Sequence, residues 1–416
     1  MTVLYDLQPV QCWAYRGRGV GRYTADLARA LDRLVADSGS KDDERLDLEF
    51  VVNESLGHLD DVAALGLTRP VRTWAELVGR TVDVLHTTGP LDPERAEFRH
   101  VPVASRRHAV TCYDLIPLIF AERYLTDPII SARYRSRLGV LAAADAVLCD
   151  SQSAADDVHR LLGVGRRRLT VIGGAADERF APPSVPLAEI RTQLRRRLPA
   201  LDARHVLAPT GWDWRKNNDG LIAAWGRLPP PVRSGRTLVI VAASEPEHRA
   251  RIDAWCDAAD VDRRKVVLTG HVDDDLLVQL YQAADLVVLP SRYEGFGLPV
   301  VEAAACGARV VCADNSSLRE VLLEPLARFD VDDLDQFGAV LLNGLTDVGF
   351  RQVLAAAPIA ADTWSTVAAR TLATYRTLLD ELRDAAGPRR PASLDAGSDT
   401  IRRVMTRLNT PAEEPR

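Results

Sequence analysis

The segment 291–307, SRYEGFGLPVVEAAACG, holds two glutamates that could bind a sugar. Glu294 directly precedes the glycine-rich stretch that contains Gly295 and Gly297, and Glu302 follows further along. A carboxylate accepts hydrogen bonds from adjacent hydroxyl groups, such as those of a hexose or a ribose. Glycine lets a ligand approach the main chain closely. The segment therefore predicts a binding site for a sugar or an anion.

A glycosidase is a poor alternative for these two glutamates. That chemistry needs two carboxyl groups about 5 to 9 Å apart, on either side of the bond that breaks. Here the apolar run DLVVLP predicts a strand, and Pro299 suits the start of a helix because its missing N–H needs no partner. Free N–H groups at that helix start would point toward an anion or sugar hydroxyls. Both glutamates would be reached from this one side.

Two neighbouring cations, Arg215 and Lys216, lie in the sequence GWDWRKNN at 211–218, between a predicted strand and a predicted helix. The helix dipole disfavours positive charge at a helix start, so the pair predicts an anion between them. A diphosphate fits, because arginine offers a planar fork and lysine a movable point charge. Lys216 is also one of only three lysines in a chain that otherwise uses arginine. A solvated basic turn is the alternative, and whether Trp212 and Trp214 line a site or the core stays open.

Three glycines, Gly17, Gly19 and Gly21, alternate in the sequence RGRGVGRY at 16–23. Their amides could cradle a phosphate between the first predicted strand and the first helix. The order G-x-G-x-G differs from the dinucleotide fingerprint G-x-G-x-x-G, so a nicotinamide site is not supported. A plain tight turn is the alternative.

Two polar residues of the first half, Asp114 and His86, lie where predicted strands end, at the edge where ligands of parallel sheets bind. Asp114, in TCYDLIPL, could orient an acceptor hydroxyl or cap a turn. His86, in DVLH, could face the site or be a hydrogen-bonded core histidine. The run Asp273–Asp275 looks like a metal site, but it precedes LLVQLY and predicts a helix cap instead.

Apolar, β-branched runs alternate with helical patterns along the chain, which predicts an α/β fold with parallel sheets covered on both faces. Strands are expected at 2–6, 48–52, 82–86, 109–113, 146–149, 169–172, 206–210, 237–242, 265–269, 286–289 and 309–312. The Pro- and Arg-rich stretch 179–200 interrupts this rhythm. We therefore expect two Rossmann-like domains, residues 1–182 and 183–385, that face each other across an interdomain cleft.

The composition excludes several classes of protein. The 416 residues are 47% hydrophobic and 26% charged, enough for two cores, and a net charge of −6 argues against a nucleic-acid binder. No run approaches the roughly 20 apolar residues of a membrane helix. Because Met1 leads directly into a strand-like run, no signal peptide is expected. Six scattered cysteines without C-x-x-C spacing predict buried thiols in a reducing cytosol and no structural zinc.

The end of the chain predicts two helices. A long helical pattern covers 363–384, and we expect this helix to pack back on the N-terminal domain. The tail 386–416 follows a Gly/Pro break and contains a short basic amphipathic pattern at 401–408. This second helix could lie on an anionic membrane surface or dock on its own domain. The expected location is the cytoplasm, with peripheral contact to the inner face of the membrane as a further hypothesis.

Taken in order, these segments resemble the family-four retaining glycosyltransferases of the GT-B fold. The matching stretches are GVGRYTADLARAL, YDLIPLIFAERYL, ADAVLCDSQSAADDV, WRKNND, GHVDDDLLVQLYQAADLVVLPSRYEGFGLPVVEAAACG and ADNSSLREV. The resemblance as a whole extends over nearly the whole chain, to about residue 380. The resemblance implies a nucleoside-diphosphate sugar held mainly by the second domain and a hydroxyl acceptor held by the first, on the side of Tyr113, Asp114 and His86. It also implies donor contacts at the matching residues. Glu294 would contact sugar hydroxyls, Glu302 the ribose, and Arg215 and Lys216 the diphosphate. The backbone amides of Gly295, Phe296, Gly297 and Leu298 would meet the sugar and the diphosphate, Gly19 and Gly21 would approach the diphosphate from the first domain, and the region Gly270–Val272 would face the nucleobase.

Two positions depart from the family's pattern. Tyr113 precedes Asp114 where members often have a histidine, so the hydroxyl contact usually made by that histidine is not carried over. Thr210 stands where many members carry an arginine, which leaves Arg215 with more of the phosphate charge. The sequence Tyr-Asp-Leu-Ile-Pro most resembles members that transfer mannose or similar sugars, and GDP-mannose is the first donor expected.

The expected mechanism follows from the charge on the leaving group. Cations and helix amides stabilise a departing diphosphate without reorganising, so no metal or other cofactor is expected. Front-face attack by the acceptor hydroxyl, with its proton passing to the leaving phosphate, would retain the anomeric configuration. The acceptor could be a glycan, a lipid-linked sugar or a small molecule, and the oligomeric state stays open. A nucleotide-sugar epimerase of the same architecture, or a non-catalytic sugar-nucleotide-binding subunit, are the alternative functions.

Overall fold

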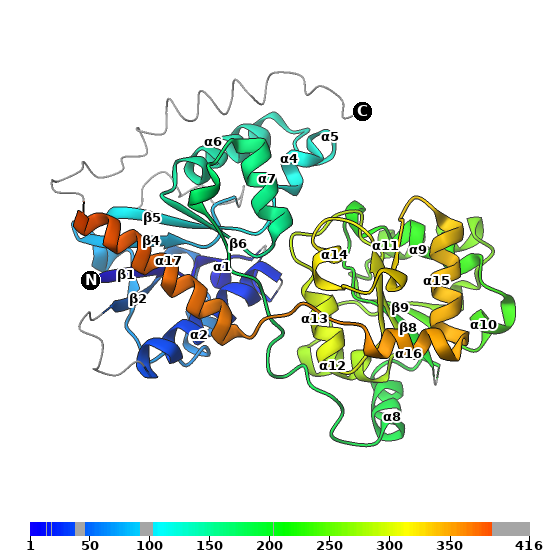
Figure 1. The fold of residues 1–416 in the computed structure, drawn as a ribbon. Coiled ribbons are helices and arrows are strands. Elements are labelled where there is room, and N and C mark those ends of the chain that lie inside the picture. The colour runs from blue at the N-terminus through cyan, green and yellow to red at the C-terminus, as the bar shows by residue number, and fades with distance from the viewer. Residues whose placement is uncertain (14, 18, 38–45, 92–102, 203, 385–416) are drawn as a thin grey trace. The chain divides into compact units, whose positions relative to one another are not determined.

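The computed structural model describes residues 1–13, 15–17, 19–37, 46–91, 103–202 and 204–384, and Figure 1 shows their fold. The chain divides into two compact units. Unit 1 comprises Met1–Gly174 and the described chain from Asp362 onward, and unit 2 comprises Ala175–Ala361. The boundary therefore lies before Ala175 rather than near 183, and the last helix belongs to unit 1. The tail 386–416, with its expected second helix, lies outside the described residues.

Unit 1 is built on one parallel sheet of seven strands in the order β3-β2-β1-β4-β5-β6-β7. The order reverses direction between β1 and β4, which are neighbours in the sheet. Near-continuous apolar runs form the central strands because helices cover both faces. The strands are β1 (Thr2–Asp6), β2 (Asp47–Val52), β3 (Val71–Thr73), β4 (Thr81–Thr87), β5 (Ala104–Cys112), β6 (Ala146–Cys149) and β7 (Leu169–Val171).

The helices of unit 1 begin and end where the sequence supplies caps. Helix α7 begins after Ser151, whose side chain accepts from the amide of Ala154, and ends at Gly163 in the left-handed conformation. The last helix, α17, packs against α2 and the sheet within one apolar core, which contains Tyr375. The helices are α1 (Gln8–Gln11), α2 (Gly19–Asp37), α3 (Leu59–Ala63), α4 (Ile116–Ile119), α5 (Ala121–Tyr124), α6 (Pro128–Ala143), α7 (Gln152–Leu162) and α17 (Trp364–Asp384).

Unit 2 repeats this architecture with six parallel strands in the order β10-β9-β8-β11-β12-β13. The reversal lies between β8 and β11, which pair with each other. In open α/β sheets, ligands bind outside the carboxyl ends of the strands at such a reversal. The strands are β8 (His205–Ala208), β9 (Thr237–Ile240), β10 (Val266–Leu268), β11 (Leu286–Leu289), β12 (Val310–Ala313) and β13 (Arg328–Phe329).

Helices cover the sheet of unit 2 and close a separate apolar core around the fully buried Trp225 and Tyr281. Asp273 is the N-cap of α12 and accepts from the amide of Leu276, as the sequence predicted. The helices are α8 (Leu187–Arg197), α9 (Asn218–Gly226), α10 (Pro230–Ser234), α11 (Pro246–Ala258), α12 (Asp274–Ala283), α13 (Leu298–Ala305), α14 (Leu318–Val321), α15 (Leu334–Thr346) and α16 (Val348–Ala356).

The structure confirms the α/β class, the parallel sheets and eleven of the strands, within a few residues at their ends. It adds two short edge strands, β3 and β13, that the sequence did not predict. All six cysteines are buried and free, as expected. Within the part of the chain that the structure describes, no helix has the length and apolar character needed to cross a membrane.

Candidate active site

The reversal point of unit 2 brings together the loops that follow β8 and β11. The loop after β8 contains a single 3-10 turn, Trp214–Lys216, which we call the Arg–Lys turn. The side chain of Asp213 caps this turn by accepting from the amide of Arg215 at 2.9 Å. Asn217 ends it in the left-handed conformation, with φ 55°, and α9 begins at the next residue. The local sequence therefore projects two adjacent cations from a short, capped turn.

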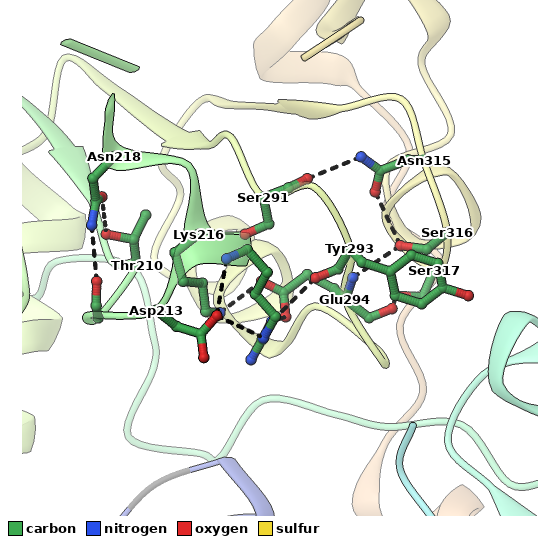
Figure 2. Close-up of polar contacts among 12 residues, drawn as sticks. Thr210, Asp213, Lys216, Asn218, Ser291, Tyr293, Glu294, Asn315, Ser316 and Ser317 are labelled. Carbon is green, nitrogen blue, oxygen red and sulfur yellow. Dashed lines mark hydrogen bonds and ion pairs between the residues drawn. The ribbon is translucent and has the colours of Figure 1, made fainter. Parts of the chain in front are cut away.

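Both cations of the Arg–Lys turn pair with Glu294 from the loop after β11. An Arg215 guanidinium nitrogen lies 2.5 Å from Glu294 Oε2, and Lys216 Nζ lies 2.6 Å from Glu294 Oε1. Arg215 also donates to the backbone carbonyl of Tyr293 at 3.1 Å. Figure 2 shows Lys216 and Glu294 directed toward each other from their two loops. The two strongest signals of the sequence thus meet at one place.

Burial and charge act in opposite directions on this ion-pair cluster. Glu294 is only 7% exposed, and burial alone would raise its pKa. The positive charges of Arg215 and Lys216 outweigh that effect and lower the pKa of Glu294 to about 2. Burial, together with the neighbouring Arg215 charge, lowers the pKa of Lys216 below its usual value. At neutral pH, Glu294 is therefore an anion held between two cations.

The loop after β12 fixes the backbone of Glu294. The Glu294 amide donates to the hydroxyl of Ser316 at 3.0 Å, and the hydroxyl of Ser317 donates to the Glu294 carbonyl at 3.0 Å. Asn315 accepts from Ser316 and donates to the carbonyl of Ser291, as Figure 2 shows. The loops after the neighbouring strands β8, β11 and β12 are therefore linked around the Glu294 carboxylate. These links fix the backbone from which the carboxylate extends.

The glycine-rich stretch ends in the helix start that the sequence predicted. Gly297 is the N-cap of α13 and has φ 106°, a conformation that favours glycine. A Cβ atom there would lie 2.9 Å from a methyl group of Leu318, so the position also lacks room for a side chain. Phe296 is 9% exposed and packs in the core, while Gly295 and Leu298 are half-buried. Helix α13 therefore begins four residues after Glu294 in the chain.

The second glutamate, Glu302, has a different set of partners. It is 6% exposed, and its Oε2 accepts from the hydroxyl of Tyr281 on α12 at 2.9 Å. Tyr281 itself is fully buried. The two carboxylates thus stand in distinct environments, one between cations and one on a phenol. This difference agrees with separate roles rather than with a paired acid and base.

Two further residues named by the sequence lie in unit 2. Thr210 is buried and donates to the side chain of Asn218, which in turn donates to the carbonyl of Gly211. Thr210 therefore fixes the start of α9 and supplies no charge at the position where many members of the family that the sequence resembles carry an arginine. Val272 is half-buried and packs on the core beside the loop after β10. Its expected contact with a nucleobase stays a prediction.

The glycines Gly19 and Gly21 belong to unit 1, at the start of α2. A Cβ atom at Gly21 would lie 2.5 Å from the carbonyl oxygen of Tyr15 and 3.1 Å from that of Pro9. At Gly19, a Cβ atom would meet nothing within 4 Å. Packing alone therefore explains Gly21, whereas no contact inside the described protein requires a glycine at position 19.

The acceptor-side residues of unit 1 differ in their surroundings. His86 is fully buried, with one ring nitrogen 2.5 Å from the Tyr375 hydroxyl and the other 2.8 Å from the Thr111 hydroxyl. The structure thus places His86 in the core, the second of the two alternatives, and does not support a contact between its ring and a ligand. Tyr113 is half-buried, and its hydroxyl lies 3.1 Å from that of Thr24.

Asp114 is half-buried and forms a turn cap. Its Oδ1 accepts from the amide of Ile116 at 2.9 Å, at the start of α4. This contact is the turn cap that the sequence offered as one of two alternatives for Asp114, and it occupies one carboxylate oxygen. A role for Asp114 toward an acceptor hydroxyl stays a prediction.

Sequence reasoning missed several residues that shape the site. Arg292 donates its amide to the Arg215 carbonyl and its guanidinium to Asn217, and Tyr281 holds Glu302. Arg292 lies in the segment SRYEGFG and Tyr281 in LLVQLYQAA, both inside stretches that the sequence singled out, but neither residue type alone indicates a partner. Among the described residues, no group of three or more His, Cys, Asp or Glu side chains is arranged to hold a metal ion.

Comparisons with known proteins identify both halves of the chain. The family "Glycosyltransferase Family 4" matches residues 17–180, and the family "Glycosyl transferases group 1" matches residues 193–332. The serotype-specific mannosyltransferase WbdA of Escherichia coli is 32% identical over 276 residues, which are 66% of this chain and 34% of WbdA. The chain thus spans about a third of the length of WbdA.

Two other relatives align over more of their own length. The O-antigen chain mannosyltransferase B of Escherichia coli is 28% identical over 419 residues, 91% of this chain and 100% of that protein. The D-inositol 3-phosphate glycosyltransferase of Acidothermus cellulolyticus is 30% identical over 329 residues, 74% of this chain and 70% of that protein.

Solved structures show the same fold at low sequence identity. Sucrose-phosphate synthase from Thermosynechococcus elongatus superposes with a TM-score of 0.63 at 20% identity, over 92% of this chain and 100% of that one. HepE of Anabaena, in complex with UDP-glucose, superposes with a TM-score of 0.62 at 17% identity, again over 92% and 100%. With these matches and the relatives above, the chain belongs to glycosyltransferase family 4 and has the GT-B fold.

Proposed function

We propose that this chain is a retaining glycosyltransferase that moves a hexose from a nucleoside-diphosphate sugar to a hydroxyl acceptor. The observation that carries the proposal is the cluster of Arg215, Lys216 and Glu294 at the reversal point of unit 2. Two half-buried cations at the carboxyl edge of a Rossmann-like sheet suit a diphosphate, and the buried carboxylate beside them suits sugar hydroxyls. Mannose is the first candidate sugar, because two relatives are named mannosyltransferases.

In the proposed mechanism, the donor diphosphate replaces Glu294 as the partner of the two cations. Glu294, released from Lys216 and Arg215, then accepts hydrogen bonds from hydroxyls of the donor sugar, while Glu302 accepts from the ribose. The amides at the start of α13, after Gly297, lie beside this exchange and add fixed dipoles. The site therefore changes partners without moving its backbone, which the loop after β12 already fixes.

The chemical step breaks the bond between the sugar and the diphosphate. Negative charge develops on the departing phosphate, and Arg215 and Lys216 stabilise it without reorganisation. The acceptor hydroxyl attacks from the face that the phosphate leaves, and its proton passes to a phosphate oxygen. One glycosidic bond forms, one sugar–phosphate bond breaks, and the anomeric configuration is retained. In this proposal the charge stabilisation comes from the two side chains and needs no metal ion.

The test is a transfer assay with a panel of donors. The protein is incubated with GDP-mannose, GDP-glucose, UDP-glucose or UDP-galactose and with a mannoside, a lipid-linked sugar or a small alcohol as acceptor, with and without EDTA. We expect one donor to give a product in which proton NMR shows the donor's anomeric configuration, with or without EDTA. An inverted product would contradict the mechanism.

The same assay separates the alternative functions. A nucleotide-sugar epimerase would convert a donor sugar without acceptor, whereas the transferase needs the acceptor to consume donor. A non-catalytic binding subunit would bind donor and turn over none. Retained transfer in a protein carrying Glu294→Gln would show that the cluster is not the active site.

A further inference from the structure

Arg292 makes three contacts with the Arg–Lys turn and with Asn217, the residue that ends it. Its backbone amide donates to the carbonyl of Arg215 at 2.6 Å. Its guanidinium donates to Oδ1 of Asn217 at 2.7 Å, and the same guanidinium lies 5.3 Å above the ring of Trp214. These contacts bracket Lys216 on both sides in the sequence.

Three groups surround the guanidinium of Arg292. Its central carbon lies over the indole ring of Trp214, while the terminal nitrogens reach Asn217 on one side and Asp332, at 3.2 Å, on the other. Stacking and forked donation in a single plane are properties of arginine that lysine lacks. The residue type is therefore matched to the position.

Asn217 is the pivot on which this contact acts. It is fully buried, adopts φ 55°, and joins the Arg–Lys turn to α9. A Cβ atom at Gly220 would lie 2.5 Å from the Asn217 side chain, so the asparagine is enclosed on the helix side. Arg292 closes the other side. A turn of three residues held at both ends has little freedom to redirect its two cations.

The charge of Arg292 is largely balanced by nearby carboxylates. One guanidinium nitrogen lies 3.2 Å from Asp332, and another lies 3.9 Å from Asp219. Arg292 also lies two residues before Glu294, the carboxylate that both cations face. The short segment 292–294 thus carries the carboxylate of Glu294 and also contacts the turn that bears Arg215 and Lys216.

We propose that Arg292 is a positioning residue, which holds the Arg–Lys turn so that Arg215 and Lys216 point at the donor diphosphate. This inference rests on the proposed function. Arg292 acts through the turn and not through its own charge on the phosphate. If Arg292 had only a structural role, its substitution would lower the stability of the protein and leave the affinity of the folded protein for a diphosphate unchanged.

The test compares GDP, UDP and pyrophosphate binding by calorimetry in six proteins. These are the wild type and the variants Arg292→Gln, Arg292→Lys, Asn217→Gly, Lys216→Met and Arg204→Gln. Arg204 is the matched control, since it pairs with Asp285 at 2.7 Å before β11, at the opposite edge of the same sheet. Asn217→Gly keeps the left-handed backbone accessible and removes the buried side chain that accepts from Arg292. It serves as the second variant if Arg292→Gln does not fold.

We expect Arg292→Gln to weaken binding of the preferred diphosphate by about tenfold or more, the scale of a lost charge-assisted hydrogen bond. Arg292→Lys keeps the charge and should weaken binding nearly as much, and Asn217→Gly should weaken it by a smaller factor. In the transfer assay, the KM for donor should rise and kcat should fall. Arg204→Gln should lower the melting temperature and leave affinity at the wild-type value.

The outcomes separate this inference from the proposed function. Wild-type affinity in Arg292→Gln and Asn217→Gly, with binding lost in Lys216→Met, would overturn the positioning role and leave the proposed function standing. Full rescue by Arg292→Lys would also overturn it, because charge alone would then suffice. A wild-type protein that binds none of the three probes would contradict the proposed function, and the positioning role would fall with it.

Discussion

At the scale of single residues, the central feature is the carboxylate of Glu294, which pairs with both cations of the Arg–Lys turn. Its oxygens lie 2.5 Å from Arg215 and 2.6 Å from Lys216. In the proposed mechanism, a diphosphate and Glu294 compete for the same two cations. Charges withdrawn from water are costly to leave unpaired, so this internal partner keeps both cations ionised and directed.

This competition gives the first prediction, for Glu294→Gln. The neutral amide retains the size of the side chain and removes the competing charge, so GDP alone should bind about as tightly as in the wild type or more tightly. Transfer should nevertheless fall by about 10²-fold or more, the scale of a lost polar contact in the transition state. Calorimetry with GDP and a transfer assay provide the two readouts.

Glu247→Gln is the control, because Glu247 is exposed on α11 and its loss changes the net charge by the same amount. It should alter neither readout. Weaker GDP binding in Glu294→Gln would show that the carboxylate supports the diphosphate instead of competing with it.

At the scale of elements, the start of α2 offers a matched pair of glycines. A Cβ atom at Gly21 would lie 2.5 Å from the backbone oxygen of Tyr15, whereas at Gly19 it would meet nothing within 4 Å. Backbone cannot yield as a flexible side chain does. We expect Gly21→Ala to destabilise the protein by about 1–3 kcal/mol, as overpacking does. Gly19→Ala should be neutral or stabilising by about 0.5–1 kcal/mol, because alanine favours the helix.

Urea unfolding measures both variants, and the donor KM adds a second readout for Gly19→Ala. If the resemblance is right that a diphosphate approaches Gly19, the extra methyl group should raise the KM in a protein that is fully stable. An unchanged KM would remove Gly19 from the donor site. Equal stability of the two variants would contradict the packing argument for Gly21.

The central strands could be predicted because they are apolar and buried on both faces. Runs such as DLVVLP have few alternative structures when helical patterns flank them. The edge strands β3 and β13 have three and two residues and include Arg72 and Arg328, so they lack that signal. The domain boundary was also displaced, since the Pro-rich stretch begins after the chain has already crossed into unit 2.

Within the site, the sequence could indicate which loops meet but not how their side chains pair. Adjacent strands bring the loops after β8 and β11 together, and that follows from topology. The direct pairing of Glu294 with both cations depends on side-chain reach, as does the contact of the Arg292 guanidinium with the ring of Trp214. His86 illustrates the same limit, because the Tyr375 that satisfies it lies 289 positions away in the chain.

At the scale of the whole molecule, the contact between His86 and Tyr375 ties the sheet of unit 1 to its last helix. Burial, with a smaller effect of the nearby His108, lowers the pKa of His86 to about 3, and burial lowers the pKa of His108 to about 4. Both rings stay neutral in the folded protein at pH values where the unfolded chain binds protons. Unfolding is therefore favoured as the pH falls below about 6.5.

The third prediction is a loss of stability between about pH 6.5 and pH 4. Within this range, the free energy of unfolding should fall by up to about 1.4 kcal/mol per pH unit for each of the two histidines. Above about pH 6.5, these two histidines should cause no change of stability with pH. His86→Gln should lower stability at neutral pH but reduce the slope by about one proton. Urea unfolding at a series of pH values measures the slope. A slope that is the same in His86→Gln and the wild type would contradict the neutral, buried His86.

The most direct test of the account compares two lysines of unit 2 by titration with GDP and UDP. Lys216 faces Glu294 in the cluster, whereas Lys265 pairs with Asp202 at 2.7 Å, away from it, and serves as the matched control. We predict that Lys216→Met weakens binding of the preferred nucleoside diphosphate by about tenfold or more, and that Lys265→Met binds as the wild type does. Wild-type affinity in Lys216→Met, or an equal loss in both variants, would contradict a diphosphate site at Arg215, Lys216 and Glu294.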